Sequence, residues 1–551
     1  MRYGIRCLHL TRIAAIATLP ELSASVTLPW MSSEQQLAPS SVWRKQITYP
    51  QLLVATFFVA LFAIGMIASR DYGISWDEPN MFSLGMKTYQ YVFQGVPWST
   101  NKGQMYHGPF FELLLAFAEH AFPRANSQQI TILRHMLTFC SFFLGVILFY
   151  LLAKRHFRSW ALALLGSLFF VLSPRVFAHA FYNSRDIPAM TLFLLSILTL
   201  LRLLDRRTIF GALCHALACA LLLSVRLTGV LLPPLTLLFL LSVWLTTKSG
   251  KQRMAVILCS LVFLIALPLF TIVVWPFLWH HPLVHFLEAY QFMREIGRDG
   301  GFFLGRQIGG IGWNYIPVWI AVTTSWLYTG FFLIGVAFQG MTMIMHPRVF
   351  SRNRTMQIFL LWFFAPIAFI VIGNANIYDE WRHVLFLYPA FLLLALECVR
   401  VILAWMSSPW RHGHVVLLVL MATSLSATFL WMIHNHPLEN MYFSIPSALA
   451  AHNFELDYWG LSFREGIEYV LAHDHRPVLV LHPTSSPGYS SVLALSAEEQ
   501  SSLRYTADDS KANYVLDNFR QHNYQATYPP EKKVKDITVD GITVLSIYRL
   551  R

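Results

Sequence analysis

Long apolar runs constrain this chain more than any other feature of its sequence. Several stretches reach or exceed the roughly 20 residues that a helix needs to cross about 30 Å of hydrocarbon. Charged residues make up only 13% of the chain, whereas soluble domains carry about 25%. The sequence therefore predicts a polytopic α-helical membrane protein.

The apolar runs predict about eleven membrane spans, which together use most of the chain. The two runs on either side of Arg226 are also compatible with a re-entrant segment in place of two full crossings. The predicted spans cover residues 50–69, 129–152, 160–178, 187–204, 209–225, 228–247, 254–276, 317–340, 357–373, 383–403 and 414–433.

The distribution of Lys and Arg predicts the orientation of these spans, because short loops rich in these residues stay in the cytoplasm. One alternate set of connections is cationic, as at Lys154 and Arg155. The other set carries only single arginines, notably Arg185, Arg226 and Arg382. We expect this second set to face outward together with the C-terminus. The net charge of +12 is then mostly a topology signal, and it does not indicate nucleic-acid binding.

The spans define the domain organisation that we expect. Residues 1–49 form an N-terminal cytoplasmic segment, with Met31 as an alternative start of the protein. Residues 50–433 form the membrane domain, which has two long outer loops at residues 70–128 and 276–316.

The tail at residues 434–551 differs from the membrane domain in its pattern of apolar and polar residues. "REGIEYVLAHDH" predicts a helix and "RPVLVLH" predicts a strand. "ITVDGITVLSIY" predicts a hairpin that turns at Asp540 and Gly541. We expect a small soluble α/β domain on the outer side.

Ionisable residues gather at the predicted outer ends of the spans. A charged side chain at or in the bilayer costs roughly a few kcal/mol unless it is paired, so each one is a candidate functional residue. The candidates are Asp77 and Glu78 after the first span, His107 in the first outer loop, Arg185 and Asp186 before the fourth span, and Arg226 and Arg382 in later turns.

Carboxylates that face several arginines suggest a particular chemistry. A carboxylate can take the proton from an attacking hydroxyl or amide, or hold a divalent cation such as Mg²⁺ or Mn²⁺. Guanidinium groups can neutralise a departing phosphate. The membrane setting points to a lipid-linked phosphate, which leaves well and needs little more than a cationic clamp that positions it.

The same segments resemble the GT-C glycosyltransferases, a family that includes protein O-mannosyltransferases and the aminoarabinose transferases of lipid A. That family carries an Asp-Glu pair after its first span, as at Asp77 and Glu78, and an Asp-x-Pro in its second outer loop, as in "RDIPAM". "YHGPFFELLLAF", "SVRLTGVLLPPL", "WRHVLFLYP" and "ELDYWGLSFREGIEYV" are similar to further family segments. Arg226 stands where Lys is usual in the family.

The resemblance implies a GT-C-like fold and transfer of one sugar from a polyprenyl-phosphate carrier to a lipid, glycan or protein acceptor. It implies an enzyme of the bacterial inner membrane with a periplasmic active site. Asp77 would be the catalytic base, supported by Glu78, and Asp186 would be a second carboxylate. A divalent cation, if one takes part, would be held by these three residues. The phosphate-binding residues would be Arg226, Arg185, Arg382 and His107.

Other interpretations of the same residues stay open. Asp77 and Asp186 are also suited to cap helices, and interfacial arginines commonly anchor helix ends at lipid headgroups. Tyr458 and Trp459 are expected only to dock the tail on the membrane face. A transporter, or a polymerase or ligase of lipid-linked glycans, would share several of these features.

Overall fold

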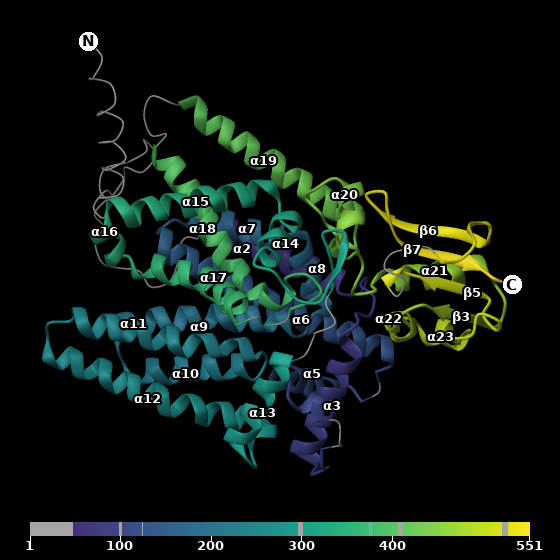
Figure 1. Cartoon of the computed structure of the whole chain (residues 1–551), viewed down its shortest axis with the longest axis horizontal. Helices are drawn as coiled ribbons and strands as arrows, with labels where there is room; N and C mark the ends of the chain where they lie inside the picture. Colours follow the sequence, from purple (N-terminus) through teal and green to yellow (C-terminus); the bar gives the residue numbers. More distant parts are fainter. Residues whose placement is uncertain are drawn as a thin grey trace, which may run out of the picture.

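A helical bundle and a small sheet domain make up the computed structural model of the chain (Figure 1). The predicted segment 1–49, with its alternative start at Met31, lies almost wholly outside the described residues. The structure describes residues 48–98, 102–123, 125–295, 301–373, 375, 377–405, 411–520 and 527–551.

The bundle is built from long apolar helices joined by short turns. The helices of its first half are α2 (Tyr49–Ala68), α3 (Glu78–Gln94), α4 (Lys102–Met105), α5 (Phe110–His120), α6 (Ser127–Phe157), α7 (Trp160–Val171), α8 (Pro174–Tyr182), α9 (Asp186–Arg206), α10 (Ile209–Leu223), η1 (Leu227–Leu231), α11 (Leu232–Thr246) and α12 (Gly250–Val274).

The second half of the bundle also contains a short two-stranded hairpin and several 3-10 helices. These elements are η2 (Pro276–Leu278), α13 (Pro282–Glu295), β1 (Gly301–Phe303), β2 (Arg306–Ile308), α14 (Tyr315–Thr323), α15 (Trp326–Met345), α16 (Pro347–Arg352), α17 (Arg354–Ile372), η3 (Arg382–Leu387), α18 (Tyr388–Trp405), α19 (Arg411–His434), η4 (Glu439–Met441) and α20 (Ser447–Asn453).

The prediction of a polytopic helical membrane protein is confirmed, although the number of spans differs from eleven. Within the described residues, nine helices are long and apolar enough to cross a membrane, or ten if the bent pair α7 and α8 counts as one span. That pair bends by 69°, because Pro174 at the start of α8 has no N–H to continue the helix. The predicted span at 209–225 is the 15-residue α10, which is short for a crossing.

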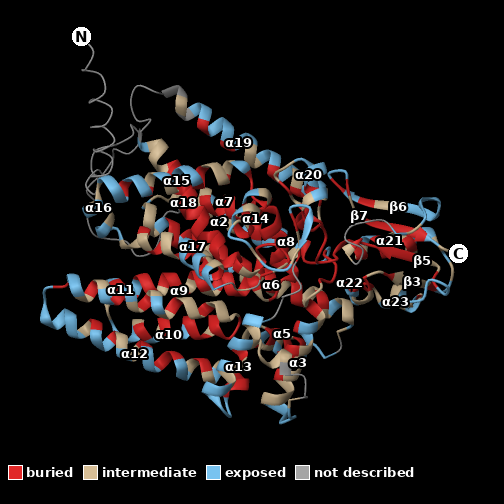
Figure 2. Ribbon diagram, in the orientation of Figure 1, coloured by how far each residue is buried: buried red, intermediate tan, exposed pale blue. Residues whose placement is uncertain are grey.

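Two helices lie at the centre of the bundle and carry predicted site residues at their outer ends. About four fifths of the apolar window is buried in α9, at 78%, and in the η3–α18 span, at 83%. The corresponding values for α2 and α19 are 17% and 22%, and Figure 2 shows α19 with much exposed surface. Because α9 begins at Asp186 and η3 begins at Arg382, both residues lie at the ends of the two most deeply buried spans of the described residues.

The small C-terminal sheet domain lies at one end of the bundle (Figure 1). Its five strands have the order β4-β3-β5-β7-β6, in which β3 runs parallel to β4 and β5, while β7 is antiparallel to β5 and β6. Its elements are α21 (Ser462–His473), β3 (Leu479–Pro483), α22 (Ser486–Ser490), η5 (Ser491–Ala494), α23 (Ala497–Ser501), β4 (Leu503–Tyr505), β5 (Tyr514–Asp517), η7 (Pro530–Lys532), β6 (Lys533–Val539) and β7 (Ile542–Arg549).

The local predictions for this domain are confirmed. The predicted helix is α21 and the predicted strand is β3. The hairpin β6–β7 turns at Asp540 and Gly541, whose φ angles are 50° and 78°. Positive φ at both central residues is the geometry that an Asp-Gly turn adopts in a two-residue hairpin.

A buried ion-pair network fixes α5 against α6. Arg134 on α6 donates to Glu112 at 2.5 Å and to Glu119 at 2.6 Å, both on α5. Ser184, in the turn before α9, also donates to Glu112. Three separate segments are therefore tied together by one guanidinium and two carboxylates.

Replacing Arg134 by Met should destabilise the protein strongly, because Glu112 and Glu119 would stay buried without their partner. Breaking a buried pair from one side costs about 3–5 kcal/mol, so we expect a clear fall in the melting temperature of the purified protein. Lys533→Met, which removes an exposed cation paired with Asp536, is the control and should leave the melting temperature unchanged. Equal melting temperatures for R134M and wild type would show that the network does not support the fold.

Candidate active site

The predicted acidic and basic residues meet at the end of the bundle that carries the C-terminal domain. Arg382 donates to Asp77 at 2.6 Å and lies 4.0 Å from Asp186. Asp186 in turn accepts from the guanidinium of Arg226. Side chains from four separate parts of the chain thus form one continuous charged cluster.

The register of α9 and α10 explains how Asp186 reaches Arg226. The two helices form an antiparallel hairpin around Arg207, with Asp186 as the first residue of α9 and Arg226 three residues beyond the end of α10. Twenty-one helical residues span about 31 Å. The 15 residues of α10, the turn at Ser224 and Val225, and Arg226 itself, which is extended with φ −143° and ψ 130°, together span nearly the same length. The short α10 therefore brings Arg226 level with Asp186.

A strained turn places Arg382 in the cluster. Asp379 and Glu380 both have positive φ, at 53° and 60°, a conformation that non-glycine residues rarely adopt. Ion pairs hold both residues there: Asp379 accepts from Arg382 at 2.9 Å, and Glu380 accepts from Arg175 at 2.5 Å. Strained backbone that persists through such contacts is common at functional sites.

His107 and Arg185 form the opposite side of the cluster. Phe110 N–H donates to the Ser224 carbonyl at 3.0 Å, which places the His107 loop against the end of α10. This approach requires glycine at position 108, since a Cβ there would lie 2.4 Å from the Ser224 carbonyl carbon. His107 Nδ1 then contacts a terminal nitrogen of Arg185.

The charges of the cluster shift the pKa values of its members. Burial alone would raise the pKa of Asp77, but Arg382, with Arg185 and Arg226 beyond it, holds that pKa below its ordinary value. Burial and then the charge of Arg226 lower the pKa of Arg185 to about 10. Burial, and then the positive charges of Arg185 and Arg226, hold the pKa of His107 well below its ordinary value. His107 is therefore neutral at pH 7, and its Nδ1 accepts the hydrogen bond from Arg185.

Arg185 differs from the other arginines of the cluster in its partners. Arg226 and Arg382 each bind a carboxylate, whereas within the described residues the hydrogen bonds of Arg185 reach only His107 and the sulfur of Met293. Its Nε is buried with no partner in that part of the chain. Among the arginines of the cluster, Arg185 is the one without a carboxylate partner in the described part of the chain.

Glu78 does not join the cluster, although it neighbours Asp77 in sequence. Its carboxylate accepts from the Ser75 N–H at 2.6 Å and contacts His135 Nε2 at 2.8 Å. Asp77 precedes α3, but its side chain makes no capping hydrogen bond and binds Arg382 instead. The Asp186 side chain binds Arg226 in the same way. The two adjacent carboxylates therefore point to different partners.

The carboxylates proposed for a divalent cation do not fit one as they stand. Asp77, Glu78 and Asp186 each bind a cationic or imidazole group instead of converging on a common point. No cluster of three or more His, Cys, Asp or Glu side chains suited to a metal occurs in the described ranges. We derive no step through a metal ion.

The C-terminal domain contributes contacts that the sequence did not predict. The Arg382 guanidinium lies over the Trp459 ring at 4.7 Å, and the Trp459 carbonyl accepts from the Trp76 N–H at 3.0 Å, next to Asp77. Arg520 donates to Asp379 at 2.8 Å and lies over the Trp76 ring. The prediction that Trp459 only docks the tail is thus too limited, since it also contacts Arg382. In the sequence, the "LDYWG" motif was the feature that could have indicated this contact of Trp459.

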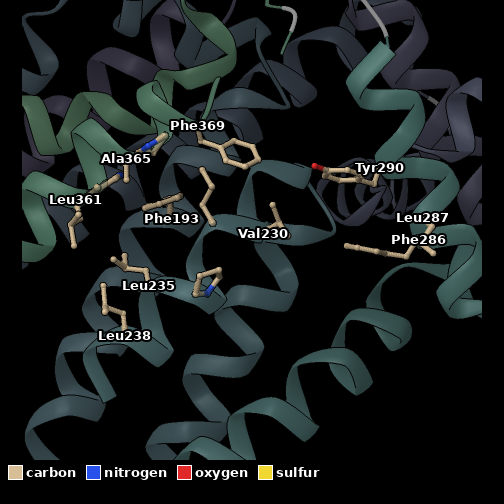
Figure 3. Close-up of a pocket in the computed structure, with 14 residues that line it drawn as sticks. Phe193, Val230, Leu235, Leu238, Phe286, Leu287, Tyr290, Leu361, Ala365 and Phe369 are labelled. Atoms are coloured by element: carbon tan, nitrogen blue, oxygen red, sulfur yellow. The ribbon is translucent and has the colours of Figure 1, made fainter. Parts of the chain in front are cut away.

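An apolar cavity of about 620 Å³ lies one to two helical turns along the chain from residues of the cluster. Its lining comes from α9, η1, α11, α13 and α17, as Figure 3 shows. Val230 follows Arg226 by one turn, and Phe193 lies two turns below Asp186 on α9. Because lining residues such as Leu238 and Phe369 are exposed, the cavity is open at the side of the bundle.

Removing the imidazole of His107 should change how stability depends on pH. Folding lowers the pKa of His107 below its unfolded value of about 6.5, so the unfolded chain binds the proton first as the pH falls. Protonation therefore favours the unfolded state, and the stability of the folded protein decreases below about pH 6.5. His107→Asn keeps an acceptor for Arg185 but does not titrate. We expect the melting temperature of wild type to fall more between pH 7.5 and pH 5.5 than that of H107N, with His473→Asn, at the exposed end of α21, as the control. A fall of equal size in H107N would refute this contribution.

Comparisons with known proteins identify the fold. No protein-family model and no curated protein matches the chain. Among solved structures, apo ArnT from Cupriavidus metallidurans matches at TM-score 0.50 and 12% identity, over 90% of this chain and 98% of that chain. ArnT bound to undecaprenyl phosphate matches at 0.49, with 13% identity over 90% and 97%. The oligosaccharyltransferase AglB from Archaeoglobus fulgidus matches at 0.48, with 10% identity over 85% and 70%. The chain has the fold of the GT-C membrane glycosyltransferases.

Proposed function

We propose that the chain is a membrane glycosyltransferase that moves one sugar from a polyprenyl-phosphate carrier to an acceptor at the outer face of the membrane. The observation that carries this proposal is the partly buried guanidinium of Arg185, which has no carboxylate partner within the described residues and whose neighbour Met293 lies one turn beyond Tyr290 of an apolar cavity. A cation next to an open apolar cavity suits a ligand with an anionic head and a long hydrocarbon tail.

The phosphate of the carrier would bind between Arg185 and Arg226. A phosphate oxygen can accept from the Nε of Arg185, which has no partner among the described residues. Neutral His107 would orient Arg185 through its Nδ1. The two terminal nitrogens of Arg382 already donate to Asp77 and Asp379, so we assign it to positioning Asp77 and not to the phosphate.

The polyprenyl tail would occupy the apolar cavity. About 620 Å³ is large enough for several isoprene units, and the open side between Leu238 and Phe369 lets the rest of the tail pass into the bilayer. The ArnT protein, whose apo form shares this fold, binds undecaprenyl phosphate. We extend that class of ligand to this chain.

Asp77 would act as the base for the acceptor. Its side chain is 28% exposed, whereas that of Asp186 is only 2% exposed. The acceptor hydroxyl or amine would pass its proton to Asp77 while its oxygen or nitrogen bonds to the anomeric carbon. The bond between that carbon and the phosphate oxygen breaks in the same step, and the arginines stabilise the polyprenyl phosphate that leaves. Attack opposite the leaving group inverts the anomeric carbon.

The binding of the donor would also make Asp77 a better base. Arg382, Arg185 and Arg226 hold the pKa of Asp77 low in the free protein, which makes the carboxylate a weak proton acceptor. A phosphate beside Arg185 and Arg226 would add negative charge and so offset part of this lowering of the Asp77 pKa. Activation of the base would therefore depend on a bound donor. Glu78 would support Asp77 indirectly, by fixing the turn at Ser75.

Asp77→Asn tests the base directly. The purified protein in lipid would be incubated with labelled polyprenyl-phosphate sugars, and release of polyprenyl phosphate would be measured. General-base groups usually contribute roughly 10² to 10⁴, so turnover by D77N should fall at least 100-fold. Asp71→Asn removes an exposed carboxylate at the same end of the bundle and should retain activity. Turnover of D77N within about twofold of wild type would exclude the role.

Arg185→Gln tests the phosphate site separately from catalysis. Loss of a charge-assisted contact to a buried anion costs roughly 1.5–3 kcal/mol, so the variant should bind polyprenyl phosphate at least tenfold more weakly. Binding would be followed by the quenching of a fluorescent polyprenyl-phosphate analogue. D77N, measured in parallel, should bind at least as tightly as wild type, because it removes a negative charge from the cluster. If R185Q binds the analogue as wild type does, the phosphate lies elsewhere.

A further inference from the structure

A second cavity lies at the opposite end of the bundle from the active site. It has a volume of about 470 Å³ and lies where α6 and α9 end and α10 begins. Arg206, the last residue of α9, is one of its lining residues, whereas Asp186 is the first residue of the same helix. The 21 residues of α9 separate the two sites by about 30 Å.

Cationic side chains dominate this second cavity. Arg155, Arg202 and Arg206 line it together with one carboxylate, that of Asp205. Arg155 donates to Asp205 at 2.8 Å, which neutralises one arginine. Arg202 and Arg206 are exposed and form no ion pair in the described part of the chain. The cavity therefore carries two uncompensated positive charges.

The same cavity borders an apolar surface. Phe210, in the first turn of α10, lines the cavity and is 76% exposed. Leu213 and Leu217 are also exposed, and they follow Phe210 at spacings of three and seven residues, which places all three on one face of the helix. An apolar stripe that leads away from a cationic cavity matches the layout of a phospholipid, with acyl chains next to an anionic headgroup.

The start of α10 adds a further cationic contribution. Thr208 accepts from the Gly211 N–H at 3.1 Å, while the other N–H groups of the first turn have no intrahelical partners. The partial positive charge of a helix N-terminus favours anions. This effect alone would not define a site, but here it coincides with two arginines around a cavity of suitable size.

We propose that this cavity binds the headgroup of an anionic phospholipid, with the phosphate held by Arg202 and Arg206 and the acyl chains packed along Phe210, Leu213 and Leu217. The proposal does not depend on the proposed function, because no residue of the cavity belongs to the active site. A free phosphate compound would use the same arginines but would not need the apolar stripe, so we favour a lipid.

The double variant R202Q/R206Q tests this site. The protein in detergent would be titrated with dioleoylphosphatidylglycerol, and binding would be followed by native mass spectrometry and by the rise in melting temperature. We expect the double variant to bind at least tenfold more weakly, since each basic residue near a lipid surface contributes measurably to the attraction. R348Q/R352Q removes the same charge from two exposed arginines on α16 and should bind as wild type does.

Three further results complete the test. Phe210→Ser should weaken binding without changing the net charge, and this single variant serves if the double variant does not fold. Inorganic phosphate and glycerol phosphate should produce no rise in melting temperature. Equal losses in R202Q/R206Q and R348Q/R352Q would show a general charge effect, and a full response to inorganic phosphate would show a site for soluble anions. Either result would overturn the proposal.

Discussion

Pairing of buried guanidinium and carboxylate groups is the constraint on which this structure depends. An unpaired charge at the edge of a bilayer is costly, and a buried charge that loses its partner destabilises the fold by several kcal/mol. The pairs here join segments that are far apart in sequence, so they also define the tertiary arrangement. They are Arg134 with Glu112 and Glu119, Arg175 with Glu380, Arg226 with Asp186, and Arg382 with Asp77 and Asp379.

Arg185 differs from these paired arginines in its surroundings. Its neighbours satisfy their charges within the protein, whereas Arg185 contacts neutral His107 and the sulfur of Met293. The burial and the charge of Arg226 that lower its pKa to about 10 would be offset by an anion. Within the described residues, Arg185 is therefore the arginine of this cluster without a carboxylate partner, and the proposed lipid-linked phosphate would supply its anion.

The sequence predicted the membrane fold and the convergence of Asp77, Asp186, Arg226 and Arg382, because interfacial charges in an apolar chain are conspicuous. It did not predict which partner each charge would take. The direction of Glu78 depends on His135, which lies inside a predicted span and gave no local signal.

The remaining differences between the sequence-based predictions and the structure also arise from tertiary packing. The roles of Trp459 and Arg520 depend on how the C-terminal domain packs against the bundle, which no periodic pattern encodes. The described residues contain nine or ten helices long and apolar enough to cross a membrane, against about eleven predicted spans, because apolar composition alone does not distinguish the 15-residue α10 or the bend at Pro174 from a full crossing. Only the hairpin geometry shows that the short α10 places Arg226 beside Asp186.

A structure of the protein determined with polyprenyl phosphate would test the central claim most directly. The account predicts that the phosphate lies within hydrogen-bond distance of Arg185 and Arg226, and that the first isoprene units lie in the cavity between Val230 and Phe369. A phosphate bound away from both arginines, or a tail bound outside that cavity, would contradict it.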